Sequence, residues 1–125
     1  MKTRAPWQLA VLIAVTVLAA YVSYRFRSPC FGGSMASLSL SGATGCDSDL
    51  AVMWYGRGLA GHMVPYLQLL PTWNGTPATV EYPVLSGALM WLLSLPASTY
   101  PEFVAITAVV MGGLAVWLTV ILYRT

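Results

Sequence analysis

Two long apolar stretches of the chain contain no charged residue, one from Trp7 to Tyr24 and the other from Phe103 to Tyr123. A helix needs roughly 20 apolar residues to cross the hydrocarbon core of a bilayer, and both stretches are close to that length. Over the whole chain only 8% of the residues are charged, against about 25% in an ordinary soluble domain. Because so few charges cannot cover a soluble surface, we predict an all-α membrane protein.

A third apolar run, Val84 to Leu95, is short for a full crossing. Flanking residues from Tyr82 to Ser98 extend it into a thin or tilted span. We therefore expect about three transmembrane helices. Residues 1–27 form the N-terminal helix, residues 28–83 form one loop, and residues 84–125 form two further helices. In the last helix, Gly112-Gly113 favours a close approach of another helix.

The first apolar run has basic residues on both sides, Lys2 and Arg4 before it and Arg25 and Arg27 after it. A basic flank followed by an apolar run is also typical of a secretory signal peptide. The length of the run favours an uncleaved signal anchor, and cleavage remains the alternative. The chain ends directly after an apolar helix, which suggests a truncated protein; a small complete protein is the alternative.

The loop changes character near its middle. Its first half is rich in Gly and Ser, which is typical of irregular structure, whereas residues 49–63 have helical periodicity. Along this segment Leu50, Met53, Trp54, Gly58 and Leu59 share one helical face, with Asp49 near the N-cap. We predict a short amphipathic helix at the membrane surface.

Cys30 and Cys46 are the only cysteines, and both lie in the loop. A disulfide across this spacing would stabilise the loop by about 3 kcal/mol in the chain-entropy picture. Disulfides persist on the oxidising side of a membrane, so we expect an extracytoplasmic loop in a multi-pass protein of the cell membrane. Two free thiols in a reducing compartment are the alternative.

Acidic residues are the main candidates for chemistry. Asp47 and Asp49 lie where the loop meets the predicted surface helix, and a carboxylate there can serve as a general base, bind a metal or cap the helix. His62 has no companion ligand at zinc-site spacing, so no metal site and no cofactor are predicted. A net charge of +2 without a basic stripe argues against a nucleic-acid partner.

The order of features from Asp49 to Pro83 resembles the first loop of GT-C-type glycosyltransferases, which are multi-spanning enzymes that use polyprenyl-phosphate sugars. The resemblance is closest to the actinobacterial alpha-mannosyltransferase branch, and it covers the N-terminal part of such an enzyme. It rests on the following pieces, in this order: Ser48-Asp49-Leu50, Trp54-Tyr55, Gly56-Arg57-Gly58-Leu59-Ala60, Val64-Pro65-Tyr66 and Glu81-Tyr82-Pro83-Val84-Leu85.

The resemblance implies transfer of a sugar, with mannose the first expectation, from a polyprenyl-phosphate donor to a lipid-linked or cell-envelope glycan acceptor. Asp49 matches the loop aspartate of the family, its catalytic base. Substrate contacts would come from Tyr55, Arg57, Tyr66, Glu81 and Tyr82, with Arg57 near the donor phosphate. Interfacial aromatics that anchor the loop are the alternative for the three tyrosines.

A second reading places the chain in another class, a small non-catalytic accessory or scaffold protein whose cysteine-closed loop binds a partner. A fragment of a transporter is a third reading. It is disfavoured because the apolar runs carry no ionisable residue at their centres.

Overall fold

A computed structural model describes residues 6–32, 48–67, 70–71, 77–78 and 82–125. The chain divides into two compact units, one made of residues 1–29 and 107–125 and the other of residues 30–106. The helix α5, Tyr100–Arg124, contributes residues to both units. Each unit is described separately below.

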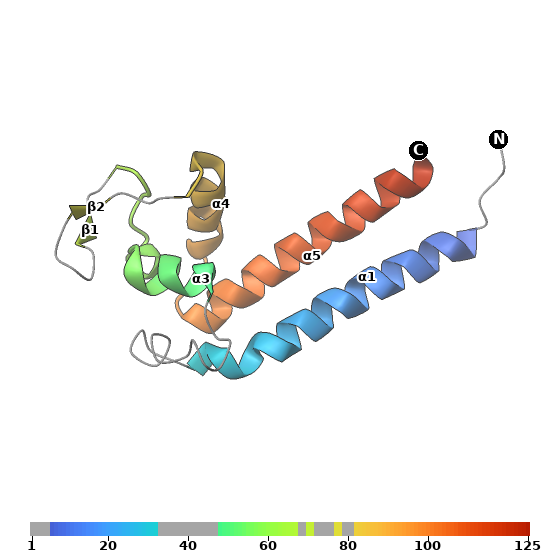
Figure 1. The fold of residues 1–125 in the computed structure, drawn as a ribbon, viewed down its shortest axis with the longest axis horizontal. Helices are drawn as coiled ribbons and strands as arrows, with labels where there is room; N and C mark the ends of the chain where they lie inside the picture. Colours follow the sequence, from blue (N-terminus) through green and yellow to red (C-terminus); the bar gives the residue numbers. More distant parts are fainter. Residues whose placement is uncertain (1–5, 33–47, 68–69, 72–76, 79–81) are drawn as a thin grey trace. The chain divides into compact units, whose positions relative to one another are not determined.

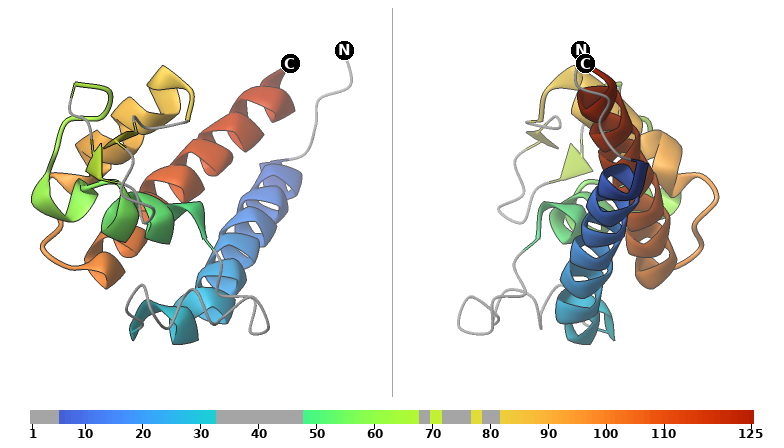
Figure 2. Two further views of the ribbon diagram at one scale, coloured as in Figure 1. Left: turned by 60° about the vertical axis from the view of Figure 1, so that its left-hand side comes forward. Right: turned by 90° about the vertical axis from the view of Figure 1, so that its right-hand side faces the viewer.

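The first unit pairs α1, Pro6–Arg27, with the later turns of α5. The Thr16 and Thr119 hydroxyls lie 3.3 Å apart, and a Cβ built at Gly112 would lie 3.8 Å from that of Ala20. Later residues of α1 therefore meet earlier residues of α5, so the two helices run antiparallel (Figure 1). The same side-by-side arrangement is visible in the views of Figure 2.

Gly112 lies against α1, as predicted, whereas Gly113 does not. A Cβ at Gly112 would make only an ordinary van der Waals contact, and a Cβ at Gly113 would meet nothing within 4 Å. Alanine would therefore fit at either position, and the pairing with α1 does not depend on glycine here.

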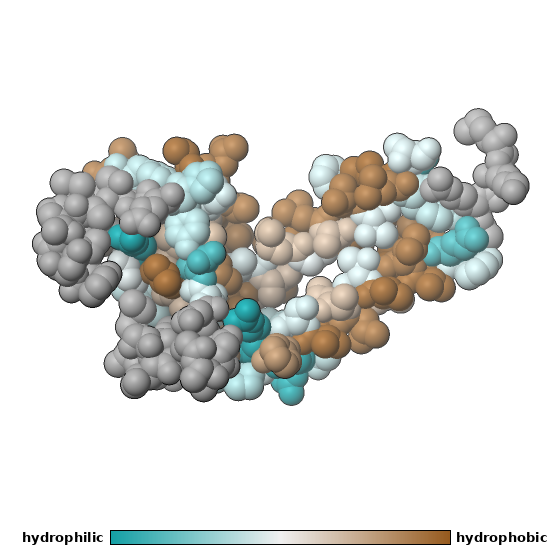
Figure 3. Space-filling view, in the orientation of Figure 1, coloured by the Kyte–Doolittle hydropathy of each residue, from teal (hydrophilic) through white to brown (hydrophobic). Residues whose placement is uncertain are grey.

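Helices α1 and α5 are long and apolar enough to cross a membrane. At 1.5 Å per residue, 22 and 25 residues span about 33 Å and 38 Å, close to or above the roughly 30 Å hydrocarbon core. Apolar side chains cover much of the visible surface of both (Figure 3). The third apolar helix, α4 (Val84–Ser94), has 11 residues, so the third span stays a prediction.

The second unit contains the short elements of the loop. A 3₁₀ turn, Ser28–Gly32, enters it from α1, and α3 (Asp49–Ala51) continues directly into a π-helical turn, Val52–Gly56. A second 3₁₀ turn, Leu59–Gly61, follows. The strands β1 (Leu70–Pro71) and β2 (Pro77–Ala78) pair antiparallel, Leu70 opposite Ala78 and Pro71 opposite Pro77. All other regular structure in the described residues is helical.

The core of the second unit joins the π-helical turn after α3 to the first turns of α5. The Trp54 ring stacks on Phe103, with centroids 5.2 Å apart and planes at 21°. The Tyr55 ring packs at a tilt on Tyr100, with ring centroids 5.2 Å apart. The Phe31 ring contacts Tyr100 edge-on, with centroids 6.3 Å apart. The buried apolar residues of the unit are Ala51, Met53, Trp54, Leu59, Ala97, Tyr100, Phe103 and Val104. Aromatic burial is therefore what holds the loop helix to α5.

The predicted surface helix is shorter than expected. It begins at Asp49 but ends at Gly56, and the expected stretch to Met63 is broken. Gly58 adopts φ = 77°, a left-handed conformation that glycine tolerates and other residues avoid. A Cβ there would also lie 2.7 Å from the Met63 sulfur. Met53, Trp54 and Leu59 are nonetheless buried, as their shared face predicted.

The N-terminus of α5 is capped by the side chains of Thr99 and Glu102. The Glu102 carboxylate accepts hydrogen bonds from the backbone N–H groups of Ser98 (2.8 Å) and Thr99 (3.1 Å). In return the Glu102 N–H donates to the Thr99 hydroxyl at 3.4 Å. This reciprocal arrangement is a capping box, and Pro101 occupies the first turn, where its missing N–H costs nothing. Local sequence therefore sets where α5 begins.

Candidate functional site

Asp49, the predicted base, is the first residue of α3. Ser48 precedes it as the N-cap in an extended conformation (φ −150°, ψ 130°), and the Ser48 hydroxyl makes no capping hydrogen bond. The Asp49 side chain is exposed. Within the described part of the chain, no hydrogen bond or ion pair engages its carboxylate. The carboxylate is therefore open to an incoming molecule.

Asp49 lies close to the end of an apolar helix. Five residues separate it from Trp54, and in a helix that separation is about 7 Å along the axis. The Trp54 ring stacks on Phe103, in the first turns of α5. The aromatic cluster therefore holds the helical segment that begins at Asp49 against the first turns of α5.

Tyr55 and Arg57 follow in the same helix and just beyond it. Tyr55 is half-buried, and its ring packs against Tyr100. Arg57 is half-buried directly after the π-helical turn, with φ −121° and ψ 18°. A π-helical turn is uncommon and often occurs at functional sites, because it shifts the side chains that follow it relative to a regular helix. Here it lies between Asp49 and Arg57.

The Tyr66 hydroxyl forms hydrogen bonds to the backbone of the protein itself. Its hydroxyl lies 2.9 Å from the carbonyl oxygen of Tyr82 and 3.1 Å from that of Pro83, and it donates to these groups at the start of α4. A Cβ at Gly87 would lie 2.1 Å from this hydroxyl, so only glycine admits the ring there. Tyr66 also has φ = 69°. Its hydroxyl therefore fixes α4, which favours a structural function over substrate contact.

A second anchor to α4 comes from Trp91, which sequence reasoning did not single out. Its indole N–H donates to the His62 carbonyl oxygen at 3.0 Å. His62, like Tyr66, has a left-handed backbone (φ = 54°). Non-glycine residues in this conformation cost free energy and persist only where surrounding contacts impose them. The only sequence signal for this anchor was an indole N–H in an apolar helix, where a buried donor needs a partner.

Several candidate residues are not brought together by the described structure. Asp47, Glu81 and Cys46 lie outside the described residues, and Tyr82 contributes a backbone carbonyl to the Tyr66 bond. Cys30 is disulfide-bonded, and Cys46 is the only other cysteine in the sequence. Among the residues with described positions, no three His, Cys, Asp or Glu side chains gather to hold a metal ion.

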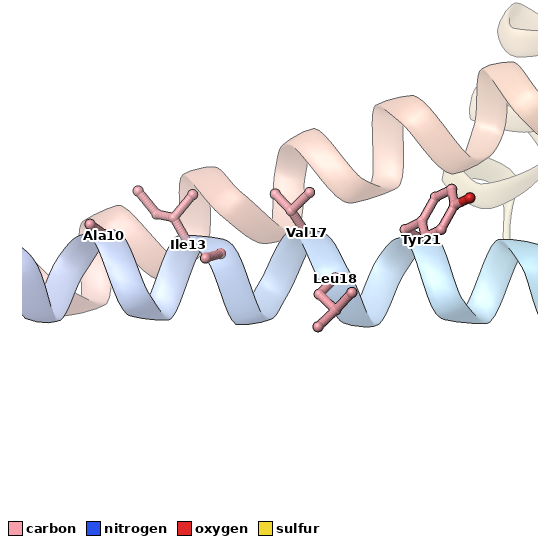
Figure 4. Close-up of a pocket in the computed structure, with 6 residues that line it drawn as sticks. Ala10, Ile13, Val17, Leu18 and Tyr21 are labelled. Carbon is pink, nitrogen blue, oxygen red and sulfur yellow. The ribbon is translucent and has the colours of Figure 1, made fainter.

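A hollow on the first unit carries no chemistry. Its lining side chains all come from α1 and are apolar apart from one tyrosine (Figure 4): Ala10, Ile13, Ala14, Val17, Leu18 and Tyr21. One helix face of this composition is typical of a surface covered by lipid. The candidate site is therefore the exposed carboxylate of Asp49 and its surroundings at the start of α5.

Comparison of the chain with known protein families, with curated protein sequences and with solved structures finds no match. The residues that support a function are thus those of this chain alone: the open carboxylate of Asp49, the half-buried Arg57 and the aromatic cluster that holds their helix.

Proposed function

We propose that the chain is the N-terminal part of a multi-pass cell-membrane glycosyltransferase of the GT-C type. It transfers a sugar, mannose in the first instance, from a polyprenyl-phosphate donor to a lipid-linked or cell-envelope glycan acceptor. The observation that carries this proposal is the exposed carboxylate of Asp49, which no described residue engages, at the start of a helix packed on the beginning of α5.

The position of Asp49 suits a lipid-borne donor. If α5 crosses the membrane, its first turns lie at the lipid–water boundary, and the Trp54–Phe103 stack keeps α3 beside them. A polyprenyl-phosphate sugar has its chain in the hydrocarbon and its reactive carbon at that boundary. Holding base, acceptor and donor in one geometry can remove several kcal/mol from the barrier, with about 7 to 11 kcal/mol as the upper range.

In the proposed reaction the Asp49 carboxylate accepts the proton of the acceptor hydroxyl. The acceptor oxygen then forms a bond to the anomeric carbon, while the bond from that carbon to the phosphate oxygen breaks. The polyprenyl phosphate leaves with the electron pair, and the anomeric configuration inverts. Arg57, beyond the π-helical turn, is the candidate for contact with the donor phosphate, because a guanidinium can bind two phosphate oxygens at once.

The disulfide bond of Cys30 supports an extracytoplasmic loop, because disulfides persist in oxidising compartments. Cys30 lies in the 3₁₀ turn that follows α1. The basic residues do not decide the side, because Lys2 and Arg4 before α1 are opposed by Arg25 and Arg27 at its other end.

The test is transfer of labelled mannose from a polyprenyl-phosphate donor in membranes that contain the complete protein. General-base catalysis contributes about 100-fold to 10,000-fold, so Asp49→Asn is expected to lower turnover at least about 100-fold at equal protein level. Glu102→Gln is the matched control, because it also exchanges a carboxylate for an amide in the first turn of a helix, and it is expected to retain turnover.

Unchanged turnover in Asp49→Asn would remove Asp49 from the mechanism. No transfer by the wild-type protein from mannosyl or glucosyl donors, together with a partner protein that co-purifies through the loop, would favour the accessory-protein reading instead.

A further inference from the structure

The pairing of α1 with α5 constrains the segment between them. The contacts of Thr16 with Thr119 and of Ala20 with Gly112 show that the two helices run in opposite directions. If α1 crosses a bilayer in one direction, α5 crosses it in the other. The segment from residue 28 to residue 99 must then begin and end on the same side of the bilayer. A single full crossing by α4 would put the two ends of this segment on opposite sides, so it is incompatible with the antiparallel pairing.

The length of α4 agrees with this constraint. Its 11 residues span about 16 Å, roughly half of the hydrocarbon core. It is followed by a turn in which the Ala97 N–H donates to the Ser94 carbonyl oxygen at 3.0 Å, and α5 begins at Tyr100. The C-terminal end of α4 therefore lies within a few residues of the level at which α5 enters the membrane.

The two faces of α4 differ sharply. Gly87 and Ser94 are buried, and Gly87 meets the Tyr66 ring, so this face packs on the loop. The opposite face consists of Leu85, Leu89 and Leu92, at helical spacings of four and three residues. These leucines are 85%, 39% and 54% exposed. One face of α4 is thus covered by the segment of residues 59–66, and the other is apolar and open.

We propose that α4 lies in the membrane interface, where acyl chains of the bilayer cover Leu85, Leu89 and Leu92. The loop segment then covers the watery side of the helix, held by Trp91 on the His62 carbonyl and by Tyr66 at the start of α4. An apolar face of this kind buries itself about 5–10 Å into the boundary between headgroups and acyl chains. The inference rests on the proposed crossings of α1 and α5, not on sugar transfer.

The first experiment tests whether the two ends of α4 lie on the same side of the membrane. Leu67→Cys and Ser98→Cys flank α4 at exposed positions, and each is treated in intact cells with a membrane-impermeant maleimide, without reductant. Both cysteines are expected to react from the same side. Reaction of one from outside and of the other only after permeabilisation would show that α4 crosses and would overturn the inference. Reaction of both only after permeabilisation would support the inference but overturn the extracytoplasmic loop.

The second experiment measures depth. A fluorophore on Leu89→Cys in vesicles is expected to be quenched more strongly by lipids spin-labelled near the headgroup than by lipids labelled deep in the chain, by at least about twofold. Val109→Cys, exposed on α5, is the matched control and should show the reverse order. Deep quenching at position 89, or no quenching by either lipid because protein or water covers the face, would overturn the proposal. Shallow quenching at position 109 would instead overturn the crossing by α5.

Discussion

The starts of α3 and α5 carry the same kind of residue and use it differently. Glu102, in the first turn of α5, accepts two backbone hydrogen bonds in a capping box with Thr99. Asp49 begins α3, where the N-cap Ser48 makes no side-chain bond and the carboxylate is exposed. Removing an N-cap typically costs about 1 kcal/mol. One helix start is therefore built for stability, whereas the other leaves its carboxylate open.

The contrast indicates how α3 is held. Three helical residues and a π-helical turn are too short to be stable alone. Burial of Met53 and the stack of Trp54 on Phe103 at the beginning of α5 supply the missing stability. Because packing at its far end fixes α3, its first residue does not have to contribute to stability and is available for chemistry.

The largest expected effect comes from breaking that packing. Trp54→Ala removes the stack on Phe103, and truncation of a buried tryptophan costs about 3–5 kcal/mol. Thermal unfolding and limited proteolysis in detergent should show a destabilised loop with α5 still helical by circular dichroism. Trp7→Ala, at a 64% exposed position, is the control and should change the unfolding free energy little. Equal effects of the two variants would show that the stack does not hold α3.

The second-largest expected effect is a loss of turnover in Asp49→Asn that is not accompanied by a loss of stability. A loss of about 100-fold in turnover equals about 2.7 kcal/mol of barrier. Asp49→Asn should show that loss without a change in unfolding temperature, because the carboxylate has no partner in the described structure. A clear drop in unfolding temperature for Asp49→Asn would mean that the carboxylate stabilises the fold, and the contrast with Glu102 would fail.

A smaller effect is expected at the cap of α5. Thr99→Ala removes the hydroxyl that accepts from the Glu102 N–H, and we expect a loss of about 1 kcal/mol in unfolding free energy. Chemical denaturation in detergent measures it, with Ser86→Ala, at an exposed position within α4, as the control. A Thr99→Ala variant as stable as wild type would show that the capping box contributes nothing.

The smallest effect is expected at Ser48. Since its hydroxyl makes no capping bond, Ser48→Ala should change the unfolding free energy by less than about 0.5 kcal/mol, the usual range for surface substitutions. The same denaturation experiment checks it. A loss equal to that of Thr99→Ala would mean that both helix starts are capped and would remove the difference between them.

The sequence predicted well those features that depend on local composition. The apolar runs predicted α1 and α5, and the periodicity of Met53, Trp54 and Leu59 predicted a buried face. The Thr99–Glu102 spacing was a recognisable capping-box signal that went unused. The early end of the loop helix was harder to predict, because the left-handed Gly58 lies in a turn whose hydrogen bonds, from Gly61 N–H and Met63 N–H to the Gly58 carbonyl oxygen, follow no helical periodicity.

Features that depend on contacts between distant residues were not predictable. The Tyr66 hydroxyl reaches the backbone at the start of α4, 16 and 17 residues away, and its expected contact with substrate stays a prediction. The antiparallel pairing of α1 and α5 brings together residues about 100 positions apart. No periodicity encodes such pairings between residues distant in the sequence.

The capping box of α5 also has a consequence for variation in the loop. Because Thr99 and Glu102 determine the first helical residue from within four positions of each other, the start of α5 does not depend on how long the preceding polypeptide is. Insertions or deletions among residues 33–47 are therefore expected to leave the first helical residue of α5 unchanged.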